Sequence, residues 1–208
     1  MVQNCKRETL RKVLRCYNAI QLFSECGRQD PKIGDYIVYL VATTDLCDWR
    51  QKPYVLTSLF ILGANPSAKY RRRLVLRILL DSMGQDDMLN VRKLQVASVF
   101  ATYISDDLNN IRDRSGNTLL HYAVRYCLLF DWLIDYLLDR GVDPNIRNRQ
   151  GETPLHVLFK YGFCGDKKID IARKLLAHGA NPNIRDRVGK TPFEYAEEVA
   201  KMLKTATQ

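Results

Sequence analysis

Residues 146–158 read IRNRQGETPLHVL, and the same thirteen-residue pattern stands at 111–123 as IRDRSGNTLLHYA and at 184–196 as IRDRVGKTPFEYA. The three copies begin 35 and 38 residues apart. A second pattern lies between them, as YLLDRGVDPN at 136–145 and KLLAHGANPN at 174–183. Self-similarity at such a period is typical of a chain built from stacked units, each of which buries its apolar face against its neighbours.

Each copy carries the residue types of a tight turn that leads into a helix. Asp or Asn at the third position can hydrogen-bond forward into the turn, and Gly at the sixth position supplies a positive φ. Thr at the eighth position can cap the helix, and Pro follows it in two copies, at the first helical position. These residues are Asp113, Asn148, Asp186, Gly116, Gly151, Gly189, Thr118, Thr153, Thr191, Pro154 and Pro192.

These patterns resemble the ankyrin repeat, in which a β-turn is followed by T-P-L-H-x-A and a pair of helices. The resemblance is specific over 107–200 and weak before residue 107. It implies an all-α fold, an ankyrin-repeat solenoid of about five helix-turn-helix repeats with β-turn fingers, capped at both ends. His121 and His156 fall where this family uses the imidazole to bond the turn backbone. Glu194 replaces the histidine in the last copy, so we expect a looser joint there.

The N-terminal half is interpreted as the same architecture with an eroded signature. Gly63 lies 78 residues before Gly141, and Gly34 with its following YIVYLVATT aligns with Gly151 and its helix. We therefore predict a single ankyrin-repeat domain over 1–208. Its predicted parts are an N-terminal capping helix (1–26), two degenerate repeats (27–63 and 64–108), two repeats (109–145 and 146–183) and a truncated C-terminal capping repeat (184–208).

The composition is that of an ordinary soluble folded protein, with 46% hydrophobic and 26% charged residues in a chain of 208. The longest uncharged apolar run, 37–44, is far shorter than the roughly 20 residues of a membrane helix. The N-terminus lacks the apolar region of a secretory signal. The chain has only three histidines and no GxxxxGK[ST], GxGxxG, GxSxG or HExxH motif, so we predict no enzyme, no cofactor and no metal site.

The six cysteines follow one another at spacings of 11, 10, 21, 80 and 37, with no CxxC pair. These spacings predict reduced, partly buried thiols in a reducing compartment and no disulfide scaffold. We expect the protein in the cytoplasm or nucleus. A short chain with eroded repeats also resembles the host-directed ankyrin proteins of viruses and intracellular bacteria, for which that compartment is in the host cell.

In proteins of the ankyrin type, the turn tips and the first helix of each pair form a concave surface for a partner. The resemblance therefore implies a non-catalytic protein-protein interaction module, an adaptor or inhibitor. The net charge of +9 favours an acidic partner, and arginine can bind carboxylates through two parallel hydrogen bonds. The candidate partner-binding residues are Arg112, Arg114, Ser115, Arg125, Tyr126, Arg147, Arg149, Gln150, Lys160, Tyr161, Arg185 and Arg187.

Three alternatives stay open at this stage. The rings of Tyr126 and Tyr161 could pack between repeats with only their tips exposed. The finger arginines could be a solvated basic edge, in which the first arginine of each pair supports its hairpin. A second basic cluster in the degenerate turn of the second repeat, consisting of Lys69, Arg71, Arg72, Arg73 and Arg77, could bind nucleic acid or act as a nuclear import signal in a nuclear regulatory factor. We favour a solvated finger for this cluster. No nucleic-acid partner and no membrane association are expected, and the chain is expected to be a monomer.

Overall fold

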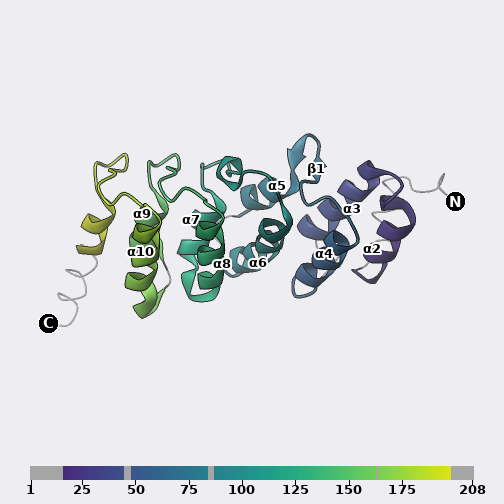
Figure 1. Cartoon of the computed structure of the whole chain (residues 1–208), viewed down its shortest axis with the longest axis horizontal. Coiled ribbons are helices and arrows are strands. Elements are labelled where there is room, and N and C mark those ends of the chain that lie inside the picture. The colour runs from purple at the N-terminus through teal and green to yellow at the C-terminus, as the bar shows by residue number, and fades with distance from the viewer. Residues whose placement is uncertain (1–15, 45–47, 84–86, 163, 198–208) are drawn as a thin grey trace. The chain divides into compact units, whose positions relative to one another are not determined.

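The computed structural model describes residues 16–44, 48–83, 87–162 and 164–197, and over these ranges the chain is mainly helical. The strands found there are β1 (Lys69–Tyr70) and β2 (Arg73–Leu74), which pair antiparallel. The prediction of an all-α repeat fold is confirmed (Figure 1). The contacts divide the chain into two compact units, Met1–Asp106 and Asp107–Gln208, each of which is described by itself. That both belong to one domain stays a prediction.

The first unit contains two helix pairs, which follow a short N-terminal helix. Helix α2 (Cys16–Leu22) continues into a π-helical turn, η2 (Phe23–Gly27). Helices α3 (Pro31–Thr43) and α4 (Lys52–Ile61) form the first pair, and α5 (Val75–Asp81) and α6 (Asp87–Tyr103) form the second. Their apolar faces bury leucine, isoleucine and phenylalanine side chains between the pairs. The capping helix predicted for 1–26 is described only from residue 16 onward, since residues 1–15 lie outside the described ranges.

Two glycines of the first unit test the alignment of the eroded repeats. Gly63 has a φ of 95° just after the end of α4, and its N–H bonds to the Phe60 carbonyl, as the Gly141 N–H bonds to the Leu138 carbonyl after a later helix. Its alignment with Gly141 is therefore confirmed. The alignment of Gly34 with a turn glycine is wrong, because Gly34 lies buried inside α3.

Packing explains why residue 34 is a glycine. A Cβ on Gly34 would lie 3.0 Å from the carbonyl oxygen of Gly27 and 3.2 Å from the ring of Phe23. The small residue therefore allows α3 to approach the turn η2 closely, and no left-handed backbone is involved.

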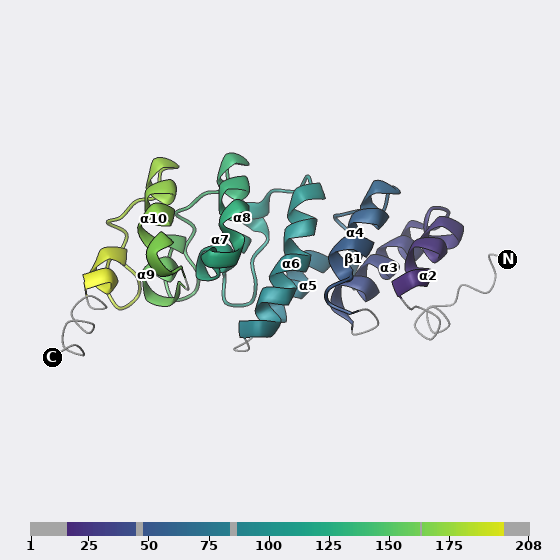
Figure 2. The same cartoon turned by 90° about the horizontal axis from the view of Figure 1, so that it is seen from below.

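The second unit repeats one arrangement of finger and helix pair. Its helices are α7 (Leu119–Arg125), α8 (Cys127–Asp139), α9 (Pro154–Tyr161) and α10 (Lys168–Ala177), with short 3-10 turns η3 (Leu108–Asn110) and η4 (Gly165–Lys167). Both views show α7 beside α8 and α9 beside α10 (Figures 1 and 2). Figure 1 shows that the loops ahead of α7 and α9 protrude on one side of these helices. A further helical segment covers 192–197.

A disulfide joins Cys127, at the start of α8, to Cys164, just before η4. The two Cα atoms are 5.2 Å apart, and the residues are separated by 37 positions. That separation is about one repeat, so the stacking of neighbouring units brings the two cysteines together. The prediction of reduced thiols is wrong for this pair, because a search for CxxC spacing overlooks cysteines that stacking brings together.

Within the described ranges, no helix is long and apolar enough to cross a membrane.

Candidate functional site

Three hairpin turns, which we call the fingers (112–117, 147–152 and 185–190), precede the helices of the second unit. In each finger the side chain at the third pattern position accepts backbone N–H groups, as predicted: Asp113 from Asn117 at 2.7 Å, and Asn148 from both Gln150 and Glu152 at 2.9 Å. The last finger has the same arrangement through Asp186. The glycines at the sixth position have φ values of 80°, 78° and 84°, which the left-handed turn requires.

Neighbouring fingers are joined by backbone hydrogen bonds at equivalent positions. The Arg149 N–H donates to the Ser115 carbonyl at 2.7 Å, and the Arg187 N–H donates to the Gln150 carbonyl at 2.9 Å. These bonds set the distance from one finger to the next without using any side chain.

The first arginine of each finger is directed at backbone carbonyls. Arg112 donates to Asn109 at 3.0 Å, Arg147 donates to Gly151 at 3.1 Å and to Arg185 at 2.8 Å, and Arg185 donates to Gly189 at 2.6 Å. Arg147 and Arg185 thus bond carbonyls of their own hairpins, as in the alternative in which these arginines support the fingers. Arg112 instead bonds Asn109, which precedes its finger.

The second arginine of each finger has a different environment. Arg114, Arg149 and Arg187 are exposed, and within the described ranges no carboxylate forms an ion pair with any of them. Three guanidinium groups therefore recur from finger to finger, with their hydrogen-bond donors available to a partner.

The two pattern histidines connect each repeat to the next finger. His121 Nδ1 accepts the Thr118 N–H at 3.1 Å, so the proton is on Nε2, which lies 3.2 Å from the Glu152 carbonyl oxygen. His156 makes the same contacts, with Nε2 at 3.1 Å from the Lys190 carbonyl oxygen. The prediction that these imidazoles bond the turn backbone is confirmed. Burial lowers the pKa of His121 to about 4 and also lowers the pKa of His156, so both are neutral scaffold groups at neutral pH.

The last repeat keeps the helix cap without the imidazole. Glu194 Oε2 accepts the Thr191 N–H at 2.6 Å, which is the bond that His121 and His156 make in their own repeats. Its Oε1 accepts from Arg185 of the finger at 3.5 Å. A carboxylate has no N–H or O–H group to donate to a following finger. Whether this joint is looser stays a prediction.

Each finger encloses one buried carboxylate, and its partner differs in the middle repeat. In the outer two, a tyrosine of the following helix donates to the finger aspartate: Tyr122 to Asp113 at 2.7 Å and Tyr195 to Asp186 at 2.5 Å. Burial, followed by these hydrogen bonds, raises the pKa of both tyrosines, that of Tyr195 to about 12. Burial opposes ionisation of Asp186, but the Tyr195 hydroxyl and two backbone N–H groups keep its pKa below the usual range.

In the middle repeat the carboxylate belongs to Glu152, and Val157 stands where the other repeats have tyrosine. Glu152 is 3% exposed. Its Oε1 accepts from Lys160 Nζ at 2.8 Å and from the Tyr161 hydroxyl at 3.4 Å, and its Oε2 accepts from Asn148 Nδ2 at 2.9 Å. Burial alone would lower the pKa of Lys160, but its hydrogen bonds to Glu152 and Tyr161 raise it.

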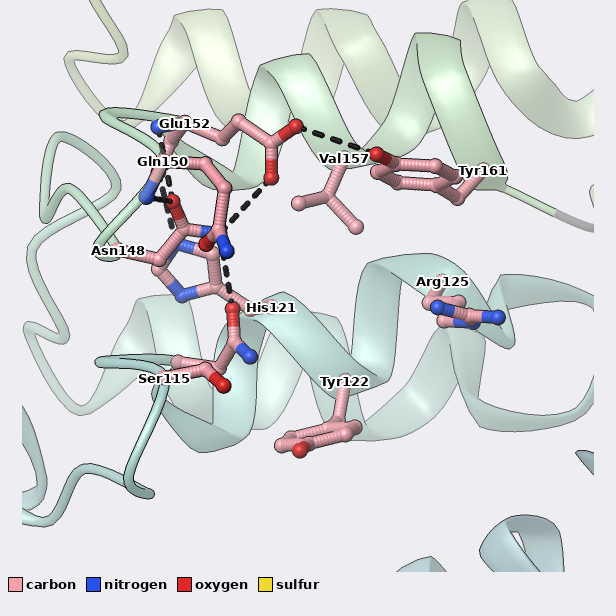
Figure 3. Close-up of a pocket in the computed structure, with 10 residues that line it drawn as sticks. Ser115, His121, Tyr122, Arg125, Asn148, Gln150, Glu152, Val157 and Tyr161 are labelled. Atoms are coloured by element: carbon pink, nitrogen blue, oxygen red, sulfur yellow. Dashed lines mark hydrogen bonds between the residues drawn. The ribbon is translucent and has the colours of Figure 1, made fainter. Parts of the chain in front are cut away.

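A pocket of about 210 Å³ lies between α7 and α9, beside Val157 (Figure 3). Three of its lining residues are exposed, so it opens to solvent. Figure 3 shows Val157 and Tyr161 on one wall, with Tyr122 and Arg125 on the other. The lining consists of Ser115, Asn117, His121, Tyr122, Arg125, Asn148, Gln150, Glu152, Val157 and Tyr161.

The structure gives different environments to the remaining residues that were predicted to contact a partner. Arg125, Tyr161 and Gln150 line the pocket, and the guanidinium of Arg125 lies 5.6 Å from the ring centre of Tyr161. Lys160 is directed at Glu152. Tyr126 is only 4% exposed, in contrast to the predicted surface position, because it stands at the junction of α7 and α8, where its ring is packed.

The second basic cluster lies on the β1–β2 hairpin and on α5 of the first unit. Arg71 and Arg72 form the two-residue tip of the hairpin, with φ values of 50° and 66°. Tyr70, next to the tip, stacks on Tyr39 with ring centres 3.8 Å apart. Arg73 instead forms an ion pair with Asp81. Lys69 and Arg77 are exposed, and Arg77 lies on the helix, away from the tip in sequence.

Sequence reasoning missed Glu152 and Val157, although the aligned copies contain a signal for both. From the first copy to the second, the acid moves from the third position to the seventh, and the tyrosine at the twelfth position is lost at the same time. Within the described part of the chain, no cluster of three or more His, Cys, Asp or Glu side chains could hold a metal ion.

A family model of ankyrin repeats (3 copies) matches residues 67–186 and 130–206, which together are more than half of the chain. The chain belongs to the ankyrin repeat family, and its repeats indicate a protein-protein interaction module. It is also similar to FPV233, an ankyrin repeat protein of fowlpox virus (strain NVSL), with 61% identity over 36 residues. That match covers 17% of this chain and 7% of the fowlpox protein, so the chain spans only a small part of the length of this relative.

Proposed function

We propose that this chain is an adaptor or inhibitor that binds an acidic segment of a protein partner along the finger tips, through Arg114, Arg149 and Arg187. The observation that supports the proposal is the recurrence of these exposed arginines on fingers joined by backbone hydrogen bonds. Because the fingers are already joined, little order has to be imposed on the chain when a partner binds. Guanidinium groups suit this role, since each can form two parallel hydrogen bonds to a carboxylate.

Arg114, Arg149 and Arg187, which we call the finger stripe, are expected to make a moderate contribution to the binding free energy. An exposed ion pair contributes roughly 0.2–1 kcal/mol, so three pairs contribute on the order of 1–3 kcal/mol. Replacing the arginines by glutamate adds repulsion to the lost attraction, so binding should weaken by about tenfold or more. The effect should shrink as salt increases, because exposed charges are screened.

The test is titration of a labelled oligoglutamate peptide with wild-type protein and with the triple variant Arg114→Glu/Arg149→Glu/Arg187→Glu. Arg112, Arg147 and Arg185 are left in place because they bond backbone carbonyls within the hairpins or just before them. A matched control changes the net charge equally at three exposed arginines of the first unit, Arg28, Arg50 and Arg92.

The proposal predicts that the finger variant alone loses binding, while both variants keep the far-ultraviolet circular dichroism of the wild type. Equal losses of binding in the two variants would mean that the effect comes from the net charge of the protein and not from the fingers. Unchanged binding in the finger variant would refute the proposal.

A second candidate function rests on the β1–β2 hairpin. A two-residue hairpin with positive φ at both tip positions ordinarily selects Asn-Gly, yet here both are arginines, beside the stacked Tyr70 and Tyr39. Arginines next to stacked rings are also a feature of surfaces that bind single-stranded nucleic acid. Steeply salt-dependent binding of an oligonucleotide, lost on Arg71→Ala/Arg72→Ala, would support this function, and no binding at low salt would refute it.

A further inference from the structure

The pocket beside Val157 lies where the neighbouring repeats place a tyrosine side chain. Tyr122 and Tyr195 stand at the same pattern position as Val157, and each donates its hydroxyl to a carboxylate of its own finger. The middle repeat keeps the buried carboxylate, on Glu152, but supplies no tyrosine at position 157. The valine leaves part of that space open as the pocket in Figure 3.

The size of the pocket suits an aromatic ring. A cavity of about 150 Å³ in a protein interior can bind benzene, and this pocket has a volume of about 210 Å³. Its lining includes the side chains of Val157, Tyr122 and Tyr161. An inserted ring would therefore contact apolar and aromatic surface on both sides.

The polar end of the pocket suits a neutral donor. A carboxylate has about four acceptor positions, and Glu152 uses three of them, for Lys160, Tyr161 and Asn148. A cationic side chain is disfavoured, because Lys160 already neutralises Glu152 and Arg125 also lines the pocket. A phosphorylated side chain is disfavoured as well, because its charge would meet that of Glu152.

We infer that this pocket receives a tyrosine side chain of the protein partner, whose ring packs on Val157 and whose hydroxyl donates to Glu152. The inference rests on the proposed function, since it gives the acidic segment one specific anchor. The finger arginines then attract the segment, and the pocket fixes its register by selecting one residue. The tyrosine ring takes the place beside the finger that Tyr122 and Tyr195 hold in their own repeats, and its hydroxyl adds a donor to those that Glu152 already has.

The first experiment uses p-cresol, the free side chain of tyrosine, as the probe. Its binding is followed by amide chemical shifts of the labelled full chain. Binding that shifts the amides around Val157 is expected for wild type and for Val157→Ala, which keeps the pocket open. It is expected to be lost in Val157→Tyr, which fills the pocket with the residue of the neighbouring repeats, and the melting temperature of each variant checks its fold.

Toluene tests the role of the hydroxyl group. A hydrogen bond to a charged group contributes enough that toluene should bind about tenfold or more weakly than p-cresol. Equal binding of the two probes, undiminished binding of p-cresol to Val157→Tyr, or no binding to wild type would each overturn the inference.

The second experiment separates the pocket from the finger stripe. Oligoglutamate peptides with a central Tyr, Phe or Ala are titrated, and the Tyr peptide should bind wild type at least tenfold more tightly than the other two. This preference should disappear in Val157→Tyr but persist in Val157→Ala, and equal affinity of the three peptides for wild type would overturn the inference. Binding of p-cresol in the pocket without binding of any acidic peptide would refute the acidic segment and leave the phenol site standing.

Discussion

Replacing His121 by glutamine separates the two hydrogen bonds that this side chain makes. Glutamine can still accept the Thr118 N–H, as a glutamine or glutamate does in a capping box and as Glu194 does in the last repeat. It loses the bond from Nε2 to the Glu152 carbonyl of the next finger, and it no longer titrates. The variant therefore tests both the joint between repeats and the pH dependence that the histidine brings to it.

The size of both effects follows from the structure. At neutral pH, a buried carbonyl that loses its donor costs about 1–3 kcal/mol. Burial lowers the pKa of His121 from 6.5 to about 4, so between these values the unfolded chain binds more protons than the folded chain. Stability is therefore greatest above pH 6.5 and falls as the pH falls through 6.5 toward 4. At 1.36 kcal/mol per pKa unit, the loss is about 3 kcal/mol.

The assay is urea unfolding of wild type and His121→Gln, followed by circular dichroism between pH 7.5 and 4. We expect wild type to be more stable by about 1–3 kcal/mol at pH 7.5, and this advantage to vanish or reverse by pH 4. His156 titrates in both proteins and so cancels in the difference. A stability difference that stays constant across this pH range would refute the assignment of a neutral, buried His121.

Three further perturbations have defined outcomes. Gly116→Ala should destabilise the protein more than Gly179→Ala does. Both sites have a positive φ, but a Cβ on Gly116 would lie 3.1 Å from a backbone nitrogen of the next finger, whereas a Cβ on Gly179 would have nothing within 4 Å. Equal urea midpoints of the two variants would contradict this prediction. Replacing Cys127 and Cys164 by alanine should lower the free energy of unfolding by about 3–4 kcal/mol, because the disulfide closes a loop of 37 residues. The same change should reduce the drop in melting temperature that a reductant causes, and an undiminished drop would contradict a stabilising role of this disulfide. Arg72→Gly should raise the melting temperature, because it relieves about 1 kcal/mol of left-handed backbone strain at the hairpin tip. A lower melting temperature would contradict this, and would mean that the arginine side chain stabilises the fold by more than its backbone conformation costs.

The fingers and helix starts of the second unit could be predicted because their signals are local. A turn glycine such as Gly151 and a capping threonine such as Thr153 act within one turn of chain, as does the bond that His156 Nδ1 accepts from the Thr153 N–H. Gly34 was misplaced for the opposite reason, since its small size is required by Gly27 and Phe23, which no local pattern at Gly34 encodes.

The parts of the candidate site that were missed depend on contacts between repeats. Cys127 and Cys164 form a disulfide because one repeat stacks on the next, and their separation of 37 residues is the signal that a search for CxxC spacing overlooks. The aligned copies show that Val157 replaces a tyrosine, but only the packing of α7 against α9 shows that a pocket remains beside it. Tyr126 was placed on the surface because an aromatic residue at a helix end does not reveal which way its ring turns.

The bonds between fingers leave the side chains at the tips free to vary. Beside the side-chain bonds that Arg147 and Asn148 make to neighbouring fingers, two bonds between fingers join a backbone N–H to a backbone carbonyl. The residues that supply these two carbonyls are as different as Ser115 and Gln150, with Val188 at the third equivalent position. A substitution at such a tip changes what is presented to the outside without changing how far apart the tips are. In the proposed function, mutation can therefore alter which partner is recognised, one finger at a time, while the backbone bonds between the fingers stay the same.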